Sequence, residues 1–441
     1  FLVEAGWFRL VGSGMTQARL LSAVAGVATV IVVAWLLRRL VGQGAGLLAA
    51  AFVAFDGWLV FTNRVGWAEN VQVPLGLIAL WGFWRLSTRP TWARLYAAGL
   101  VLGAITVYKL VGVTFLLGGL LYLWLERYRL RQFLTVLAGA ATMGVAFVLG
   151  MSVWAGKQFI SDNYHQLLRA TGIVKSRGAV QGTSSAVGPL VHQYSIYLAS
   201  VGLLALVGGL LLWRCWQVLI ETVRTVRLSS KPQSWFGYVP LAWRSLRNEG
   251  FEPVRRANSL LFAWALASYA VFGLGHLWLP HYLILILVPA ACYLAAELQL
   301  WLRQRSWGKL RKVMVTALTL LVIAGGLVSY AERIVVHPDN AVGQTLAWMA
   351  DAQNAPPDAK VITEEFIGNQ IGQPYCKITH AQECEQAAGR PDFIITYETT
   401  TEKLPTSQAL TRLLGYGTVV AEFTGFKETI RIYKIRPAIK R

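Results

Sequence analysis

The sequence predicts a polytopic α-helical membrane protein with a small C-terminal α/β domain, and three observations support this prediction. Hydrophobic side chains make up 55% of the 441 residues and charged side chains only 14%, far below the roughly 25% of a soluble globular chain. Apolar segments of helical length fill the chain up to residue 334. After residue 334, apolar and polar side chains alternate instead, and the chain contains the β-branched runs that are typical of strands. We therefore predict a transmembrane domain at residues 1–334 and an α/β domain at residues 335–441.

Ten apolar segments are candidates for membrane spans, each of which needs about 20 apolar residues, or somewhat fewer. They are Leu20–Leu37, Ala45–Thr62, Val71–Trp84, Leu95–Tyr108, Val111–Leu125, Phe133–Trp154, Ile196–Trp213, Leu260–Leu274, Tyr282–Leu300 and Val313–Val328. Several of them are short. The stretch from Leu95 to Leu125 is either a pair of spans or one broken element.

The connections between the apolar segments alternate between many and few basic residues. Residues 1–334 carry a net charge of +20, and residues 335–441 a net charge of −1. In the apolar part, 21 of the 30 Lys and Arg residues lie in every second connection, which the positive-inside rule assigns to the cytoplasm. The positive charge therefore indicates topology and excludes a nucleic-acid partner. Ten spans place both Phe1 and the C-terminal domain outside the plasma membrane.

The first residues indicate that the chain continues upstream. FLVEAGWFRLVGSG (residues 1–14) is typical of the end of an interfacial helix, and it has neither an initiator Met nor the regions of a signal peptide. We expect at least one further span, and part of an outer loop, before Phe1.

The four cysteines fall into two pairs. Cys215 and Cys292 lie in or beside apolar segments, where we expect buried packing residues. Cys376 and Cys384 lie in the predicted outer domain. Their separation suits a disulfide in an oxidising compartment, but two free thiols fit the sequence equally well.

Three charged residues flank one predicted outer turn, in AFDGWLVFTNRVGWAEN (residues 54–70). Asp56 and Glu69 lie on either side of Arg64. One interpretation is an ion pair of Arg64 with either acid that fixes the hairpin. The other is a site for a substrate with phosphate and hydroxyl groups, because Arg binds phosphate in a bidentate manner.

Other candidates lie at the predicted level of the outer headgroups. Lys109 separates two apolar runs, and we expect no nearby acid to neutralise it, so it either snorkels to the interface or binds an anionic headgroup. His281 and Tyr282 begin a later span, where they either pack at the interface or contact phosphate or sugar. The long outer loop from Lys157 to His192 is either a solvated loop or a mobile lid. Its candidate binding residues are His165, Arg169, Lys175 and Arg177.

Several other chemistries leave no trace in the sequence. There is no Walker lysine loop, no GxSxG, no HExxH and no paired CxxC, and the six His residues are scattered. We therefore predict no metal-binding set of His residues, although a divalent cation stays an open question.

Four stretches resemble the GT-C glycosyltransferases, in particular the group of protein O-mannosyltransferases and lipid A aminoarabinose transferases. Residues 1–42 resemble the outer-loop helix, the connecting Arg and the span that follows. Residues 54–70 resemble the family's Asp-aromatic, Ser-Arg and Arg/His-x-Asp stretch. GAITVYKLVGVTFL (103–116) resembles its short re-entry with Lys, and LWLPHYLILILVPAACYLAA (277–296) its Arg-Tyr-Leu-x-Pro span.

The resemblance implies a transferase with its active site on the outer face. Such enzymes take a sugar from a polyprenyl-phosphate donor and pass it to a protein, lipid or glycan. A carboxylate in the first outer loop deprotonates the acceptor, and cations stabilise the leaving phosphate. That acid is expected upstream of Phe1, which leaves Asp56 and Glu69 as weak catalytic candidates.

For the donor phosphate, the resemblance implies Arg64, Lys109, His281 and Tyr282. This chain has Glu69 where the family has Asp, and His281 where it has Arg. Both departures favour an alternative, a catalytically inactive GT-C-like subunit that binds lipid or supports a membrane complex. A transporter of lipid-linked sugars would need charged residues at mid-span, and the sequence has few of them.

Overall fold

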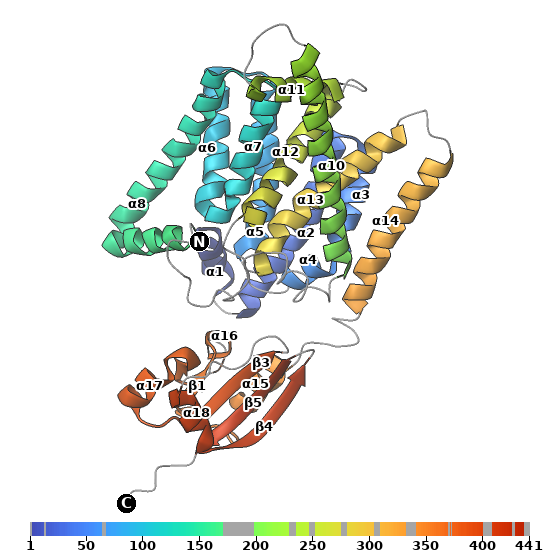
Figure 1. The fold of residues 1–441 in the computed structure, drawn as a ribbon. Coiled ribbons are helices and arrows are strands. Elements are labelled where there is room, and N and C mark those ends of the chain that lie inside the picture. Colours follow the sequence, from blue (N-terminus) through green and yellow to red (C-terminus); the bar gives the residue numbers. More distant parts are fainter. Residues whose placement is uncertain are drawn as a thin grey trace, which may run out of the picture. The chain divides into compact units, whose positions relative to one another are not determined.

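The computed structural model describes residues 2–12, 15–63, 68–170, 198–228, 235–246, 252–274, 280–303, 309–331, 341–368, 371, 373–399, 408–425 and 428–435. The chain divides into two compact units, Phe1–Ser329 and Tyr330–Arg441 (Figure 1). The described part of each unit has a hydrophobic core of its own.

The first unit is helical throughout its described residues (Figure 1). Its elements are α1 (Leu2–Val11), α2 (Met15–Leu40), α3 (Gln43–Ala54), α4 (Gly57–Thr62), α5 (Ala68–Ser87), α6 (Trp92–Tyr108), η1 (Leu110–Gly112), α7 (Val113–Leu125), α8 (Leu130–Ala170), α10 (Leu198–Leu228), α11 (Trp235–Leu246), α12 (Glu252–Leu274), η3 (Pro280–Leu283), α13 (Ile284–Arg303) and α14 (Lys309–Tyr330). Within α8 the backbone breaks at Gly156, where φ is 66°.

Four of the described helices are long and apolar enough to cross a membrane. These helical segments are Thr16–Leu40, Leu130–Val153, Ser200–Arg227 and Ile284–Arg303. Shorter apolar helices occupy Gln43–Ala54, Trp92–Tyr108, Leu110–Leu125 and Lys312–Val328. The chain is thus a multi-pass membrane protein, whereas the count of ten spans stays a prediction.

Two predicted segments differ in detail from the structure. The segment Ala45–Thr62 is not one helix, because α3 ends at Ala54 and α4 begins at Gly57. The stretch from Leu95 to Leu125 contains two helices, α6 and α7, with Lys109 in an extended conformation between them (φ −155°, ψ 134°). Each break contains one of the charged residues that the sequence predicts as site candidates, Asp56 in the first and Lys109 in the second.

Helix α13 forms the centre of the first unit. All of its residues from Ile284 to Leu298 are buried, and it packs against α3, α10 and α12. On one side of the unit, α6 and α8 approach closely through Gly99 and Gly139, because a Cβ at either position would overlap the backbone of the facing helix. Such contacts between small residues are typical of helices packed in membranes.

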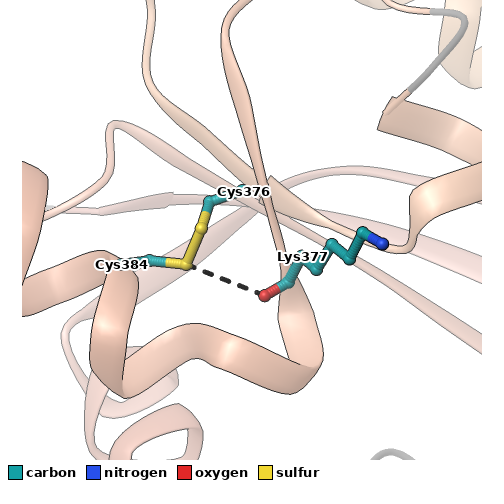
Figure 2. Close-up of a disulfide and its surroundings, with 3 residues drawn as sticks. All are labelled: Cys376, Lys377 and Cys384. Atoms are coloured by element: carbon teal, nitrogen blue, oxygen red, sulfur yellow. Dashed lines mark hydrogen bonds between the residues drawn. A yellow bond between two sulfur atoms is a disulfide. The ribbon is translucent and has the colours of Figure 1, made fainter. Parts of the chain in front are cut away.

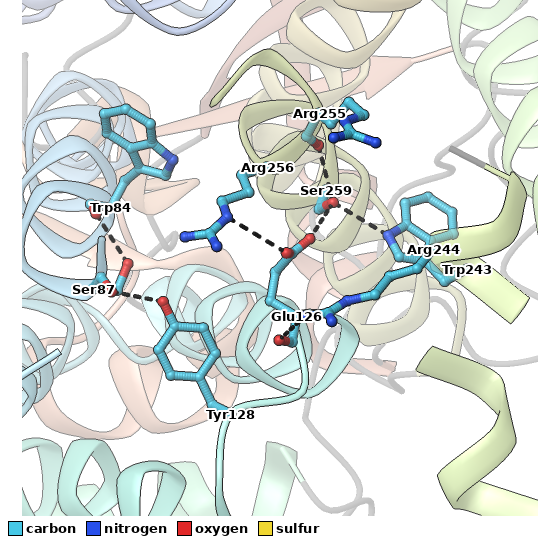
Figure 3. A network of polar contacts seen from close by, with 9 residues as sticks. All are labelled: Trp84, Ser87, Glu126, Tyr128, Trp243, Arg244, Arg255, Arg256 and Ser259. Carbon is cyan, nitrogen blue, oxygen red and sulfur yellow. Dashed lines mark hydrogen bonds and ion pairs between the residues drawn. The ribbon is translucent and has the colours of Figure 1, made fainter. Parts of the chain in front are cut away.

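Glu126 and Glu297 are two of the buried carboxylates that connect helices in this unit. At the end of α7, the Glu126 side chain accepts a hydrogen bond from Ser259 Oγ (2.8 Å) and pairs with Arg256 (4.0 Å). Arg244 donates to the Glu126 carbonyl oxygen at 2.6 Å (Figure 3). These contacts hold the α7 end against α11 and α12.

The second carboxylate is Glu297 on α13. It accepts hydrogen bonds from Arg214 of α10 (2.9 Å) and from Asn258 of α12 (3.0 Å). Its side chain is only 2% exposed. Three helices therefore meet at one buried charge whose partner is itself partly buried.

The second unit contains one mixed five-stranded sheet. Its elements are α15 (Ala341–Ala350), β1 (Val361–Thr363), α16 (Glu365–Gly368), β2 (Tyr375–Lys377), η5 (Ile378–His380), α17 (Ala381–Ala388), β3 (Phe393–Thr399), α18 (Gln408–Gly415), β4 (Gly417–Gly425) and β5 (Glu428–Ile435). The strand order is β2-β1-β3-β5-β4. Strand β1 pairs in parallel with β2 and β3, and β5 pairs antiparallel with β3 and β4. Apolar side chains form a core on each face of this sheet.

Cys376 on β2 and Cys384 on α17 form a disulfide (Figure 2). Of the two alternatives that the sequence leaves open, the structure therefore contains the bridge. It attaches the edge strand of the sheet to the helix that follows it. Cys215 and Cys292 are free, and Cys292 is fully buried.

We expect removal of this disulfide to lower the stability of the second unit by about 2–3 kcal/mol. The bridge closes a loop of sequence separation 8, and a short loop restricts the unfolded chain by that order of free energy. The measurement is limited proteolysis of the full chain in increasing urea, comparing wild type with the Cys376→Ser/Cys384→Ser variant. The control is Cys215→Ala, which alters a free thiol. Equal urea midpoints for the double variant and wild type would contradict the prediction.

Candidate functional site

The candidate site is built around the break between α6 and η1. The residues here, Val107 to Val111, contain neither Gly nor Pro. The helix nevertheless ends at Tyr108, and the amide of Gln72 on α5 donates to two carbonyl oxygens at this end. The acceptors are Ile105 O (3.1 Å) and Lys109 O (2.9 Å). Two carbonyl oxygens at the end of α6 therefore accept hydrogen bonds from a side chain of another helix.

The Lys109 side chain extends from this break to two partners. Its ammonium forms an ion pair with Glu69 of α5 and lies 5.6 Å from the centre of the Tyr282 ring, within the range of a cation–π contact. Glu69 is 1% exposed, whereas Lys109 is 32% exposed. The expectation that Lys109 lacks a nearby acid is therefore wrong: the acid is 40 positions away in sequence but adjacent in space.

A second contact attaches α1 to the same break. The hydroxyl of Tyr108, which precedes Lys109, donates to Glu4 Oε1 at 2.5 Å. Glu4, Glu69 and the residues around Lys109 thus come from three helices, α1, α5 and α6, and Tyr282 from η3 adds a fourth segment. An anion that approaches Lys109 would meet one partly exposed cation that Glu69 already pairs with, next to the Tyr282 ring.

Asp56 has a different set of partners. Its carboxylate accepts hydrogen bonds from the backbone N–H of Leu59 (2.9 Å) and from Ser200 Oγ (2.8 Å). It lies in the break before α4, outside both α3 and α4, and caps the N-terminus of α4. Its described contacts give it a structural role.

We expect Asp56→Ala to be about 1–2 kcal/mol less stable than wild type, because it removes the cap of α4 and the acceptor of the Ser200 hydroxyl. Asp56→Asn should retain most of this stability. Its side-chain oxygen can accept from the Leu59 N–H, and its amide N–H can donate to Ser200 Oγ.

The measurement is the thermal unfolding temperature in detergent, compared among wild type, Asp56→Asn and Asp56→Ala. Equal unfolding temperatures for wild type and Asp56→Ala would refute the capping role.

The other predicted site residues cannot be placed with their side chains. Arg64, Lys175 and Arg177 lie outside the described residues. The expectation that the outer loop begins at Lys157 is wrong, because α8 continues to Ala170 and contains both His165 and Arg169. His281 lies in η3, and only the backbone of these three residues is described. The structure thus brings together Glu69, Lys109 and Tyr282 from the predicted set, and it assigns Asp56 to separate contacts.

Gln72 and Tyr108 are the residues that sequence reasoning missed. Gln72 follows Glu69 by three positions, so both lie on one face of α5. A fully buried glutamine in an apolar helix needs hydrogen-bond partners, and that requirement is the signal that could have identified it. For Tyr108, the only signal in the sequence was its position next to Lys109.

Metal binding has no support among the residues that the structure describes. No group of three or more His, Cys, Asp or Glu residues in that part of the chain is placed to hold an ion. The charged groups that are described near Lys109 are carboxylates, of which Glu69 already binds the ammonium.

Residues 2–154 match the protein family described as dolichyl-phosphate-mannose-protein mannosyltransferase. Among solved structures, ArnT from Cupriavidus metallidurans is similar in its apo state (TM-score 0.53) and bound to undecaprenyl phosphate (TM-score 0.52). In both, the identity is 14%, and the match covers 96% of this chain and 85% of the other. No curated protein matches the sequence.

A further match is the archaeal oligosaccharyltransferase AglB from Archaeoglobus fulgidus, in complex with an inhibitory peptide and a dolichol-phosphate. It has a TM-score of 0.44 and 12% identity, and covers 89% of this chain and 60% of the other. The likeness to ArnT extends over nearly the whole chain and shows a common fold.

Proposed function

We propose that this chain is a membrane glycosyltransferase of the GT-C superfamily, and that it transfers a sugar from a polyprenyl-phosphate donor to an acceptor on the outer face of the membrane. The proposal is supported by the family match of residues 2–154 and by the fold that the chain shares with ArnT. The matched family is described by a lipid-phosphate sugar donor, and one ArnT structure contains undecaprenyl phosphate. The acceptor class, whether protein, lipid or glycan, is left open by this proposal.

The proposal rests on Lys109, Glu69 and Tyr282, which we call the Lys109 cluster. The Lys109 side chain, 32% exposed, lies at a helix break, pairs with the buried Glu69 carboxylate and contacts the Tyr282 ring. A positive charge held in this way suits a lipid phosphate, whose negative charge grows as the sugar leaves. Glu69 and Tyr282 would orient Lys109, while Arg64 and His281 would add further contacts to phosphate or sugar.

The proposal also includes the side of the membrane on which the α/β unit lies. An even number of spans would put the second unit on the same side as the Lys109 cluster, and a disulfide in this unit suits an oxidising compartment. This orientation supports acceptor binding outside the cytoplasm.

A transfer assay in proteoliposomes tests the proposed function. The protein is reconstituted and supplied with radiolabelled polyprenyl-phosphate mannose, then with the corresponding aminoarabinose donor, together with membrane extract as acceptor. We expect label to pass from at least one lipid donor to acceptor, and none from a nucleotide sugar alone. Transfer from the nucleotide sugar in the absence of lipid carrier would contradict the proposal.

The alternative of an inactive lipid-binding subunit is favoured by one specific contact. The Glu69 carboxylate already neutralises Lys109, as a structural ion pair would. This alternative predicts binding of undecaprenyl phosphate without transfer from either donor. The same proteoliposomes distinguish the two functions when binding and transfer are both measured.

A further inference from the structure

Gln72 forms a buried connection between α5 and the main chain at Lys109. Its side chain is fully buried, and one amide nitrogen donates to both Ile105 O and Lys109 O. Gly112 lies against this amide, since a Cβ at that position would overlap Gln72 Nε2 and Ile105 O. The amide is therefore held in place from two sides.

The two acceptors explain why the helix ends here. In an uninterrupted α-helix, the Ile105 carbonyl would accept the N–H of the residue four positions later, which is Lys109. Lys109 has left the helix (φ −155°, ψ 134°), and the Gln72 amide takes over the carbonyl. The residues Val107 to Val111 contain no Gly or Pro that would end the helix. The Gln72 side chain therefore provides the helix-ending contact that the sequence of α6 lacks.

Gln72 and Glu69 act on the same residue from the same face of α5. Glu69 binds the Lys109 ammonium, and Gln72 binds the Lys109 carbonyl. The two positions are three apart, which puts them on neighbouring turns of one helix face. Backbone and side chain of Lys109 are thus both fixed by α5.

We infer that Gln72 is a positioning residue that directs the Lys109 ammonium toward the lipid phosphate. The inference rests on the proposed function for the phosphate, and on the hydrogen bonds for the positioning. Being fully buried, Gln72 acts on the phosphate only through Lys109. Without the amide, α6 can continue through Lys109 with its regular hydrogen bond, and each added helical residue turns the side chain by about 100°.

The first test is Gln72→Met, which keeps the length of the side chain and removes both donors. We expect the KM for the lipid donor to rise about tenfold, as for loss of one oriented charge contact, with a smaller change in kcat. Lys109→Ala combined with Gln72→Met should be no worse than Lys109→Ala alone, because residues in one network are not additive. Independent, multiplying losses would overturn the inference.

The second test reaches the same amide from the other side. Gly112→Ala would displace Gln72 Nε2 and should reproduce the rise in KM. The matched control is Gly82→Ala on α5, where the added Cβ meets only Val101 at 3.9 Å and donor binding should be unchanged. If Gln72→Met does not fold, every measurement is made on Gly112→Ala instead.

A third readout separates the inference from the proposed function. The rate at which a lysine-reactive reagent labels Lys109 is measured by mass spectrometry of the full chain in detergent at one pH. We expect labelling several-fold faster in Gln72→Met than in wild type, because the ammonium leaves Glu69. Should Lys109→Ala leave transfer unchanged, the donor role fails, while this labelling still reports on positioning. Equal labelling in folded wild type and variant would overturn the positioning role.

Discussion

Replacing Lys109 with alanine is expected to lower sugar transfer by about 100-fold or more. The proposed role of the ammonium is to stabilise the charge that develops on the leaving phosphate, and loss of one such group costs about two to three orders of magnitude. Lys109→Arg should keep part of the rate, since it retains the charge with another geometry. The measurement is initial rate of transfer from the lipid donor in proteoliposomes.

The same substitution has a second effect that must be separated from the first. Alanine leaves the Glu69 carboxylate, 1% exposed, without its cation, which costs about 3 kcal/mol of stability. Lys109→Met combined with Glu69→Gln removes both charges and should recover most of the stability but none of the transfer. Lys309→Ala, at an exposed position that starts α14, is the control. Full transfer by a folded Lys109→Met/Glu69→Gln variant would exclude the phosphate role.

Replacing Arg214 with alanine is expected to give the largest loss of stability, about 3–5 kcal/mol. The Glu297 side chain would stay buried among α10, α12 and α13 without the guanidinium that pairs with it, while the Asn258 hydrogen bond remains. A buried charge without its counter-ion costs that much. Thermal unfolding in detergent measures the change.

Two further variants make this prediction specific. Arg214→Met combined with Glu297→Leu should be close to wild type, because apolar side chains can replace a buried ion pair at little cost. Arg224→Ala affects a pair with Glu221 that is 4.0 Å long, with Arg224 72% exposed, and should change stability by less than about 0.5 kcal/mol. A double variant as unstable as Arg214→Ala would show that the loss comes from packing.

The helical unit was largely predictable because its apolar segments follow from composition alone. Every predicted segment overlaps a helix of the structure. The break at Asp56 was not predicted, since it depends on a cap contact and on Ser200, 144 positions away. In the second unit, the short edge strand β2 (Tyr375–Lys377) could not be predicted from the sequence, because three residues carry too little alternation to be recognised.

The candidate site was predictable by residue type but not by pairing. Glu69 and Lys109 were both identified as charges near the outer end of spans, yet their ion pair arises from the packing of α5 against α6. Local sequence contains no information on that packing. The same holds for Gln72, whose partners lie 33 and 37 positions away.

The Glu69 carboxylate also has a consequence for turnover. Since it is attached to the protein beside Lys109, it acts as an internal competitor whose effective concentration is fixed by the fold. In the proposed reaction, a lipid phosphate gains the ammonium only by displacing this carboxylate, and the carboxylate recovers it when the spent carrier leaves. The ion pair would therefore limit product inhibition by the lipid phosphate, at the expense of donor affinity.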